Sequence, residues 1–306
     1  MKNTKLLSLL LLIAAAWGCK KETNILPAVS SSDAVVRNSS LAESGSLSWY
    51  KHNGYLNGTT YWANNGIGKV VSLGFGWADY KSVFATDSGV IYGIQADGKL
   101  IWYRNKGYLD GAAIWANGGV GIQVGSGWAN FKSVFATDGG VIYGIQADGK
   151  LIWYKHNSYL TGATNWANNG AGKEVSLAPG WAEFKSVFAT DSGAIYGIRQ
   201  NGNLEWYRHK GYLKGNSKWA NSGLGIIVSL APGWADFKSV FATSSGAIYG
   251  IRQNGNLEWY RHKGYLKGNS KWANSGLGIT VSLAPGWADF KSVFAANYGI
   301  IYGINP

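Results

Sequence analysis

Short apolar runs separated by glycine-containing turns dominate the chain after its first 45 residues. One representative stretch holds the runs Phe131–Thr137, Val141–Ile145 and Leu151–His156, which are rich in β-branched and aromatic residues. After a longer segment, Lys173–Ala178 supplies a fourth run. Runs of this length and composition are typical of β-strands. The pattern therefore predicts four antiparallel strands in each stretch of about 50 residues.

The second and third runs are joined by the sequence Gln146-Ala147-Asp148-Gly149-Lys150. An Asp-Gly pair suits the positive φ angles of a type I′ turn. We therefore expect a β-hairpin at this position, and at each place where the pattern recurs.

The same pattern recurs five times, and tryptophan marks it. Three sets of Trp repeat at spacings of 51 or 53 residues, and together with Trp17 they account for all 16 Trp of the chain. The first set is followed by Tyr, the second by Ala-Asn, and the third is preceded by Gly. The sets are Trp49, Trp102, Trp153, Trp206 and Trp259; Trp62, Trp115, Trp166, Trp219 and Trp272; and Trp77, Trp128, Trp181, Trp234 and Trp287.

Five repeats of four short strands predict an all-β fold, a closed five-bladed β-propeller over residues 45–306. The chain ends on a second-type strand that lacks its hairpin partner, within Ile300–Pro306. The repeats begin on a third-type strand that also lacks its partner, within Ser46–His52. Pairing these two strands would complete the fifth blade and leave no exposed sheet edge there.

The first 44 residues follow a different pattern. Lys2 and Lys5 precede an apolar run at residues 6–17, which is too short to span a bilayer, and small residues lead to Cys19. The arrangement resembles a bacterial lipoprotein signal, which makes residues 1–18 the signal peptide and Cys19 the lipidated residue. An ordinary secretory signal is the alternative. The serine-rich residues 20–44 have the composition of a flexible tether. We expect an exported lipoprotein, anchored in the outer membrane or at the cell surface of a Gram-negative bacterium.

The long loop after each third strand carries the residues best suited to bind a ligand. Aromatic rings beside amide and imidazole groups suit carbohydrate, because the C–H face of a sugar packs on a ring and its hydroxyls need directional partners. The loop candidates are His52, Tyr55, Trp62 and Asn64; Tyr108, Trp115 and Asn117; His156, Tyr159, Trp166 and Asn168; His209, Tyr212, Trp219 and Asn221; and His262, Tyr265, Trp272 and Asn274. The second loop has Asn105 in place of His.

We expect different roles for the three tryptophan sets. We expect the first set to pack between blades and the second to contact the ligand. The third set, Trp77, Trp128, Trp181, Trp234 and Trp287, suits core packing or sugar contact equally. Each histidine suits a hydrogen bond either to the ligand or to its own loop. One His per repeat does not make a metal site, which needs several converging ligands. We expect no metal and no cofactor.

The motifs Gly-Trp-Ala-Asp-Phe (Gly233–Phe237), Ile-Tyr-Gly-Ile (Ile248–Ile251) and the Trp-Ala-Asn loop resemble the tachylectin-type five-bladed propeller lectins. The likeness covers residues 46–306. It implies a monomeric ring that binds N-acetylated amino sugars such as GlcNAc or GalNAc, with one site per blade. The implied partners are glycans that carry these sugars.

Three other functions are weighed against this one. An enzyme needs a unique acid–base or nucleophile pair, whereas the acid after Gly-Trp-Ala becomes Asn at Asn130, so we expect no catalytic residue. The net charge of +12 invites a nucleic-acid interpretation, but its lysines are spread over the repeats and an exported protein rarely meets nucleic acid. A protein-interaction scaffold remains an alternative, since Tyr and Trp also lead protein interfaces.

Overall fold

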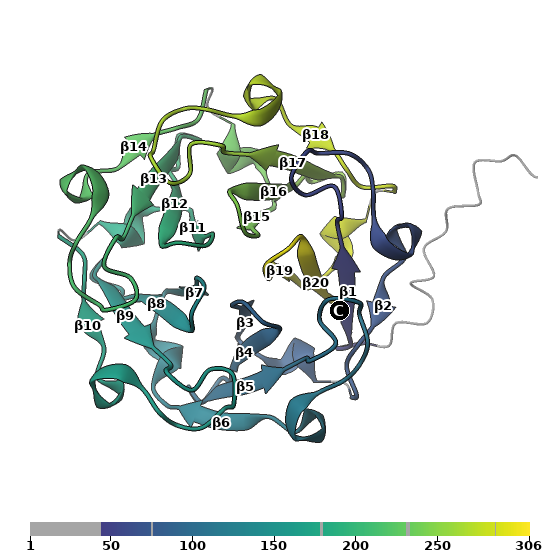
Figure 1. The fold of residues 1–306 in the computed structure, drawn as a ribbon, viewed down its shortest axis with the longest axis vertical. Coiled ribbons are helices and arrows are strands. Elements are labelled where there is room, and N and C mark those ends of the chain that lie inside the picture. The colour runs from purple at the N-terminus through teal and green to yellow at the C-terminus, as the bar shows by residue number, and fades with distance from the viewer. Residues whose placement is uncertain (1–43, 75, 178–179, 231–232, 285) are drawn as a thin grey trace, which may run out of the picture. The chain divides into compact units, whose positions relative to one another are not determined.

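A computed structural model of the protein describes residues 44–74, 76–177, 180–230, 233–284 and 286–306. The expected signal peptide, Cys19 and nearly all of the tether lie outside the described residues. Within them, five four-stranded antiparallel sheets surround a central axis as the blades of a propeller (Figure 1). No described helix is long and apolar enough to cross a membrane. The all-β five-bladed propeller predicted from the repeats is confirmed.

Each blade runs from an inner strand to an outer strand. Blade 1 contains β3 (Ser82–Ala85), β4 (Val90–Ile94), β5 (Leu100–Arg104) and β6 (Ile122–Gly125). Blade 2 contains β7 (Ser133–Ala136), β8 (Val141–Ile145), β9 (Leu151–Lys155) and β10 (Lys173–Glu174). Blade 3 contains β11 (Ser186–Ala189), β12 (Ala194–Ile198), β13 (Leu204–Arg208) and β14 (Ile226–Ile227). Blade 4 contains β15 (Ser239–Ala242), β16 (Ala247–Ile251), β17 (Leu257–Arg261) and β18 (Ile279–Thr280). Blade 5 contains β19 (Ser292–Ala295), β20 (Ile300–Ile304), β1 (Leu47–Lys51) and β2 (Lys69–Val70).

Short 3₁₀ turns punctuate the links between strands. One kind precedes each inner strand: η3 (Trp77–Asp79), η5 (Trp128–Asn130), η7 (Trp181–Glu183), η9 (Trp234–Asp236) and η11 (Trp287–Asp289). The other kind follows the second-set Trp in each long loop: η2 (Ala63–Gly66), η4 (Ala116–Gly119), η6 (Ala167–Gly170), η8 (Ala220–Gly223) and η10 (Ala273–Gly276).

The ring closes within blade 5, as the incomplete strands at the two ends of the repeat region predict. Strand β1 pairs antiparallel with β20 over five residues, from Leu47 opposite Ile304 to Lys51 opposite Ile300. The inner strands neighbour one another around the axis, and β19 lies beside β3 to complete the circle (Figure 1).

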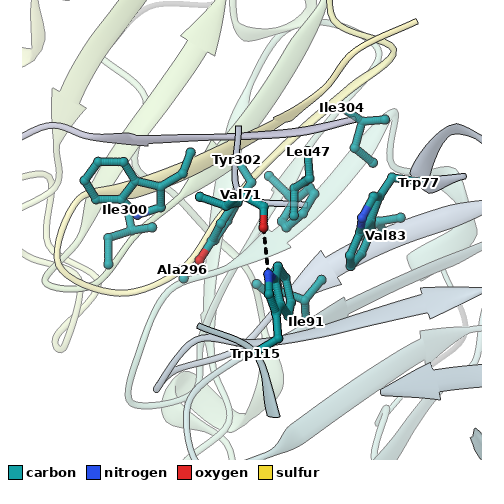
Figure 2. Packing of buried hydrophobic residues seen from close by; sticks show 13 residues of the cluster. Leu47, Val71, Trp77, Val83, Ile91, Trp115, Ala296, Ile300, Tyr302 and Ile304 are labelled. Carbon is teal, nitrogen blue, oxygen red and sulfur yellow. Dashed lines mark hydrogen bonds between the residues drawn. The ribbon is translucent and has the colours of Figure 1, made fainter. Parts of the chain in front are cut away.

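The core lies between neighbouring blades. Figure 2 shows the layer between blades 5 and 1, where Leu47 and Tyr302 pack with Val83 and Ile91. The glycine of each Tyr-Gly-Ile strand is required there. A Cβ on Gly93 would lie 2.5 Å from the ring of Tyr80, so only a residue without a side chain lets this ring pack against the strand.

The hairpin turn differs from the one predicted. Of Asp148 and Gly149, only the glycine has a positive φ, of 86°. The Gly149 amide donates to the Gln146 carbonyl at 3.0 Å, and the Asp148 carboxylate accepts the Lys150 amide. A type I turn followed by a left-handed glycine explains these bonds, because type I′ would need positive φ at both positions.

Candidate functional site: aromatic clefts between the blades

The structure brings the second and third tryptophan sets together in every blade. In blade 1, the ring centroids of Trp77 and Trp115 lie 5.9 Å apart, although the residues are 38 positions apart in sequence. The same pairing recurs as Trp128–Trp166, Trp181–Trp219, Trp234–Trp272 and Trp287–Trp62, at 5.8–6.1 Å. Five equivalent aromatic pairs therefore stand around the ring.

Within the described residues, a cleft opens beside the pairs of blades 1 and 2. In blade 1 it has a volume of about 540 Å³, and its walls include Trp77, Trp115 and Tyr103, with Gln95 and Asp79 as polar groups. In blade 2 the equivalent cleft measures about 510 Å³. Its lining includes Trp128, Trp166, Tyr154, Gln146, Asn130 and Asn169. Both volumes fall in the range that small-molecule sites occupy, and aromatic walls with a few polar groups are typical of such sites.

Local backbone chemistry places both tryptophans of a pair. Gly76, with a φ of 126°, turns the chain into η3 and brings Trp77 against Tyr103, with 4.7 Å between ring centroids. On the other side, Asn117 adopts a left-handed φ of 51° inside η4, and its amide donates to the Val120 carbonyl at 3.0 Å. Asn tolerates this conformation better than other residues with a Cβ.

The same turn recurs at every candidate asparagine. Asn64, Asn168, Asn221 and Asn274 repeat the left-handed backbone and the side-chain bond to the carbonyl three residues on. The side-chain N–H groups of these residues are therefore used to shape the loop.

The second-set tryptophans also hold neighbouring blades together. The Trp115 indole N–H donates to the carbonyl of Val71 in blade 5 at 2.6 Å, as Figure 2 shows. Its four equivalents donate to the carbonyls of Val281, Val124, Val175 and Val228. In blade 1, Trp77 and Trp115 are only 8% and 9% exposed. These rings therefore form walls that offer edges to a ligand, rather than open stacking platforms.

The histidines lie beneath the tryptophans and do not reach solvent. His52 is fully buried, stacks on Trp62 at 4.5 Å, and bonds the Tyr249 hydroxyl through Nδ1 and the Thr59 carbonyl through Nε2. Because a carbonyl only accepts, Nε2 carries the proton and Nδ1 accepts from the tyrosine. His156, His209 and His262 repeat these contacts with Tyr92, Tyr143 and Tyr196. Of the two roles expected for His, the bond to its own loop is the one observed.

Burial also determines the charge of these imidazoles. It disfavours the protonated form and lowers the pKa of His52 to about 4, against a smaller opposing effect of the bond to the Thr59 carbonyl. His262 behaves in the same way, with a pKa of about 4, and burial lowers the pKa of His156 and His209 as well. The imidazoles are therefore neutral at physiological pH.

The loop tyrosines lie at one end of the blades, and the β4–β5 and β8–β9 hairpin turns that border the clefts lie at the opposite end. The Tyr108 carbonyl accepts the indole N–H of Trp49 from blade 5, and first-set tryptophans make this bond to the next blade throughout the ring. The expected inter-blade packing of the first set is thus observed. Tyr159 and Tyr212 donate their hydroxyls to Asp87 and Asp138 on the inner turns. Of the predicted loop residues, only the tryptophans line the two clefts described, together with neighbouring residues of η4 and η6.

Sequence reasoning missed two groups of cleft residues. Tyr103 and Tyr154 follow first-set tryptophans directly, so strand alternation places them on the opposite face, where they enter the clefts. Gln95 and Gln146 close the β4–β5 and β8–β9 turns. The alternation in the Trp-Tyr pair was the signal that could have identified the tyrosines.

The five sites are not chemically identical. Gln95 and Gln146 are replaced by Arg in blades 3 and 4, where Arg199 binds Glu205 at 2.8 Å and Arg252 binds Glu258 at 2.8 Å. In blade 5 the position holds Asn305, whose amide is buried and bonds Ser46 and Ser48. Within the described part of the chain, no three His, Cys, Asp or Glu residues gather closely enough to hold a metal ion.

A comparison with protein-family models identifies the family to which the chain belongs. The Tachylectin family model matches residues 40–228 and 227–306. The chain belongs to the Tachylectin family. The resemblance seen in the sequence motifs is thereby confirmed, and membership supports a carbohydrate-binding propeller. A search of curated protein sequences found no match.

Matches to solved structures have low sequence identity and low TM-scores. Prp20p from Saccharomyces cerevisiae matches with 13% identity and a TM-score of 0.36, covering 78% of this chain and 58% of that one. Human WBSCR16 matches with 10% identity and a TM-score of 0.38, covering 83% and 66%. The SapL1 lectin, solved with alpha methyl fucoside, matches with 16% identity and a TM-score of 0.36, covering 67% and 66%. The match spans less than two-thirds of each of these three structures.

Proposed function

We propose that this member of the Tachylectin family is a multivalent lectin that binds N-acetylated amino sugars, such as GlcNAc or GalNAc, with one site in each blade. The observation that carries the proposal is the fivefold recurrence of the tryptophan pair beside the long loop. A catalytic site would be single, whereas this arrangement is repeated with the symmetry of the ring. We therefore also propose binding without turnover of the glycan.

The cleft of blade 1 offers complementary chemistry for such a sugar. The edges of Trp77 and Trp115 provide an apolar wall for the C–H groups of the ring and the methyl of the acetamido group. Gln95 and Asp79 provide a donor and acceptors for hydroxyl and amide groups. The lining needs no metal ion to complete it.

Multivalency would compensate for weak individual sites. A shallow sugar site binds with a Kd on the order of a millimolar, worth about 4 kcal/mol. Several sites on one rigid ring raise the avidity for a dense glycan surface by about 10² to 10⁴ without new contacts. We propose that export and lipidation at Cys19 display the ring at a cell surface, where such glycans occur.

Isothermal calorimetry of the propeller with free GlcNAc tests the proposal. We expect saturable binding at several sites per chain, and competition by free sugar of any binding to immobilised glycan. If partners were bound without such competition, the protein-scaffold alternative would hold and the lectin proposal would fail.

A further inference from the structure

The five loops that follow the third strands form one end of the propeller. This loop face is defined by residues 52–61, 105–114, 156–165, 209–218 and 262–271. Each loop contains a Tyr-Leu pair whose leucine is 38–48% exposed: Leu56, Leu109, Leu160, Leu213 and Leu266. The loop after β1 reaches over blade 4, where the Tyr55 carbonyl accepts the Trp259 indole N–H (Figure 1). The five leucines therefore repeat around the ring on one face.

These leucines are held in place by the adjacent blade. The Lys51 ammonium donates to the Leu109 carbonyl at 3.0 Å, and the Arg104 guanidinium donates to the Leu160 carbonyl at 2.8 Å. The bond recurs from Lys155, Arg208 and Arg261 to the carbonyls of Leu213, Leu266 and Leu56. Gly111, with a φ of 72°, packs directly against the Trp49 ring, which further fixes the position of the loop. Because the loop backbone is already fixed, binding through an exposed leucine costs little further conformational entropy.

The loop face also carries an excess of positive charge. The loops of blades 3 and 4 both read His-Lys-Gly-Tyr-Leu-Lys-Gly-Asn-Ser-Lys and contain no acid. Their six lysines are all exposed: Lys210, Lys214, Lys218, Lys263, Lys267 and Lys271. The other three loops together add Lys106 and Asp110. The inner turns at this end hold carboxylates that are already hydrogen-bonded to protein donors: Asp87, Asp138 and Asp191.

Further apolar side chains are exposed on blades 5 and 1. Tyr61 and Ile114 are exposed near the ends of the loops of blades 5 and 1, and Tyr298 is exposed on the β19–β20 turn. A surface that combines fixed leucines, exposed aromatic rings and exposed lysines is complementary to a bilayer interface, where apolar groups enter the acyl boundary and cations meet phosphates.

We propose that the loop face docks on a lipid bilayer rich in anionic headgroups, with the leucines entering the interface and the lysines of blades 3 and 4 contacting phosphates. A sulfated polysaccharide would satisfy the lysines alone, and it would leave the five leucines exposed. The leucines therefore favour a lipid surface over a soluble polyanion.

This docking is independent of sugar binding. Gln95 and Gln146 of the clefts lie on the β4–β5 and β8–β9 turns, at the opposite ends of the strands from the loop face. A docked ring would therefore keep these turns, and the polar ends of the clefts, away from the bilayer. Sugar binding and membrane docking are thus separable by experiment.

Vesicle co-sedimentation of residues 44–306 tests the proposal, because this segment contains every strand of the closed ring and excludes Cys19. We expect binding to phosphatidylcholine vesicles that contain phosphatidylglycerol, weaker binding to pure phosphatidylcholine, and loss of binding at high salt. The loop of blade 2 supplies natural replacements. Changing Lys214→Thr and Lys267→Thr together, after Thr161 at the same loop position, should weaken binding at least about tenfold at low salt.

The matched control is the double variant Lys99→Gln and Lys150→Gln, which removes the same charge from exposed turns at the opposite end. It should retain vesicle binding to within about twofold. The variant Leu213→Ser with Leu266→Ser should weaken vesicle binding and leave dextran sulfate binding unchanged. An unchanged circular dichroism spectrum and an unchanged urea midpoint verify the fold of each variant. Equal loss in the control variant, no binding to anionic vesicles at low salt, or vesicle binding that ignores the leucine changes would overturn the proposal.

Discussion

Tyr302 of β20 meets Asn105 of blade 1 at the boundary between blades 5 and 1. Among the described residues, this is the one boundary between blades that lacks the tyrosine–histidine hydrogen bond. Both side chains are fully buried, and neither the Tyr302 hydroxyl nor the Asn105 Nδ2 makes a hydrogen bond of normal geometry, although Asn105 lies close to the Tyr302 hydroxyl. At the other four boundaries the equivalent tyrosine bonds a histidine Nδ1 at 2.8–2.9 Å. A buried polar group without a partner costs about 1–3 kcal/mol. The boundary between blades 5 and 1 is therefore weakened at this point.

Replacing Asn105→His should stabilise the propeller. The imidazole would accept from Tyr302 and donate to the Ala112 carbonyl, seven residues on, as His52 does to Thr59. We expect the free energy of unfolding to rise by about 1–2 kcal/mol, measured by urea denaturation at pH 7.5. The reverse change His156→Asn should lower it. A destabilised Asn105→His variant would show that the site has no room for the imidazole.

Acid should destabilise the fold through the same histidines. Their pKa is lowered in the folded state, to about 4 for His52 and His262, whereas an unfolded histidine titrates near 6.5. Between pH 4 and pH 6.5 the unfolded chain therefore binds more protons than the folded chain. The stabilisation from the neutral imidazoles is fully present above pH 6.5, and the free energy of unfolding declines as the pH falls toward 4. The full effect is about 3 kcal/mol for each of these two imidazoles.

Urea denaturation at several pH values measures this dependence. His52→Asn should flatten the decline between pH 6.5 and 4, because one buried imidazole is gone. Burial raises the pKa of Asp191, which acts in the opposite direction, and the comparison with the wild-type chain isolates the histidine contribution. If the free energy of unfolding of the variant fell with pH as steeply as that of the wild type, burial would not be what keeps His52 neutral.

Removing polar cleft residues should remove sugar sites one at a time. We expect calorimetry with a monovalent amino sugar to give close to five sites per wild-type chain. Gln95→Ala and Gln146→Ala each remove a side chain from one cleft, so the double variant should weaken binding at about two of the five sites and leave the other three unchanged. Trp219→Ala should remove about one site, at some cost in stability, since its indole also bonds Val175. A stoichiometry of one in the wild type would contradict the multivalent lectin.

The proposed lipid anchor depends on one residue, Cys19. If Cys19 is lipidated, Cys19→Ser should move the protein from the membrane fraction to the soluble fraction of expressing cells and abolish labelling by a fatty-acid analogue. A wild-type chain that takes up no label would identify an ordinary secretory signal. Washing the membranes at high salt is included as a control, because it releases any protein held only by the loop face.

The repeats in the sequence were sufficient to predict the architecture. Five copies of a four-strand pattern, each with tryptophans at the same three positions, predict a closed ring. The unpaired strands at Ser46–His52 and Ile300–Pro306 predicted where the ring closes. Strand alternation and turn chemistry are local properties, so a single repeat already contains them. The prediction of a type I′ turn was wrong: Asp148 and Gly149 permit two turn types, and the chain adopts the one in which only Gly149 has a positive φ.

Which of the candidate residues line the clefts depends on tertiary packing. The histidines and loop tyrosines looked equivalent to the tryptophans in sequence, yet packing of one blade on the next buries His52 beneath Trp62 and places Trp77 beside Trp115. The pairing of second- and third-set tryptophans depends on how each loop folds back over its own blade and on the carbonyl of the preceding blade that fixes it. These contacts join segments far apart in the chain, and no local pattern of hydrophobic and polar residues records them.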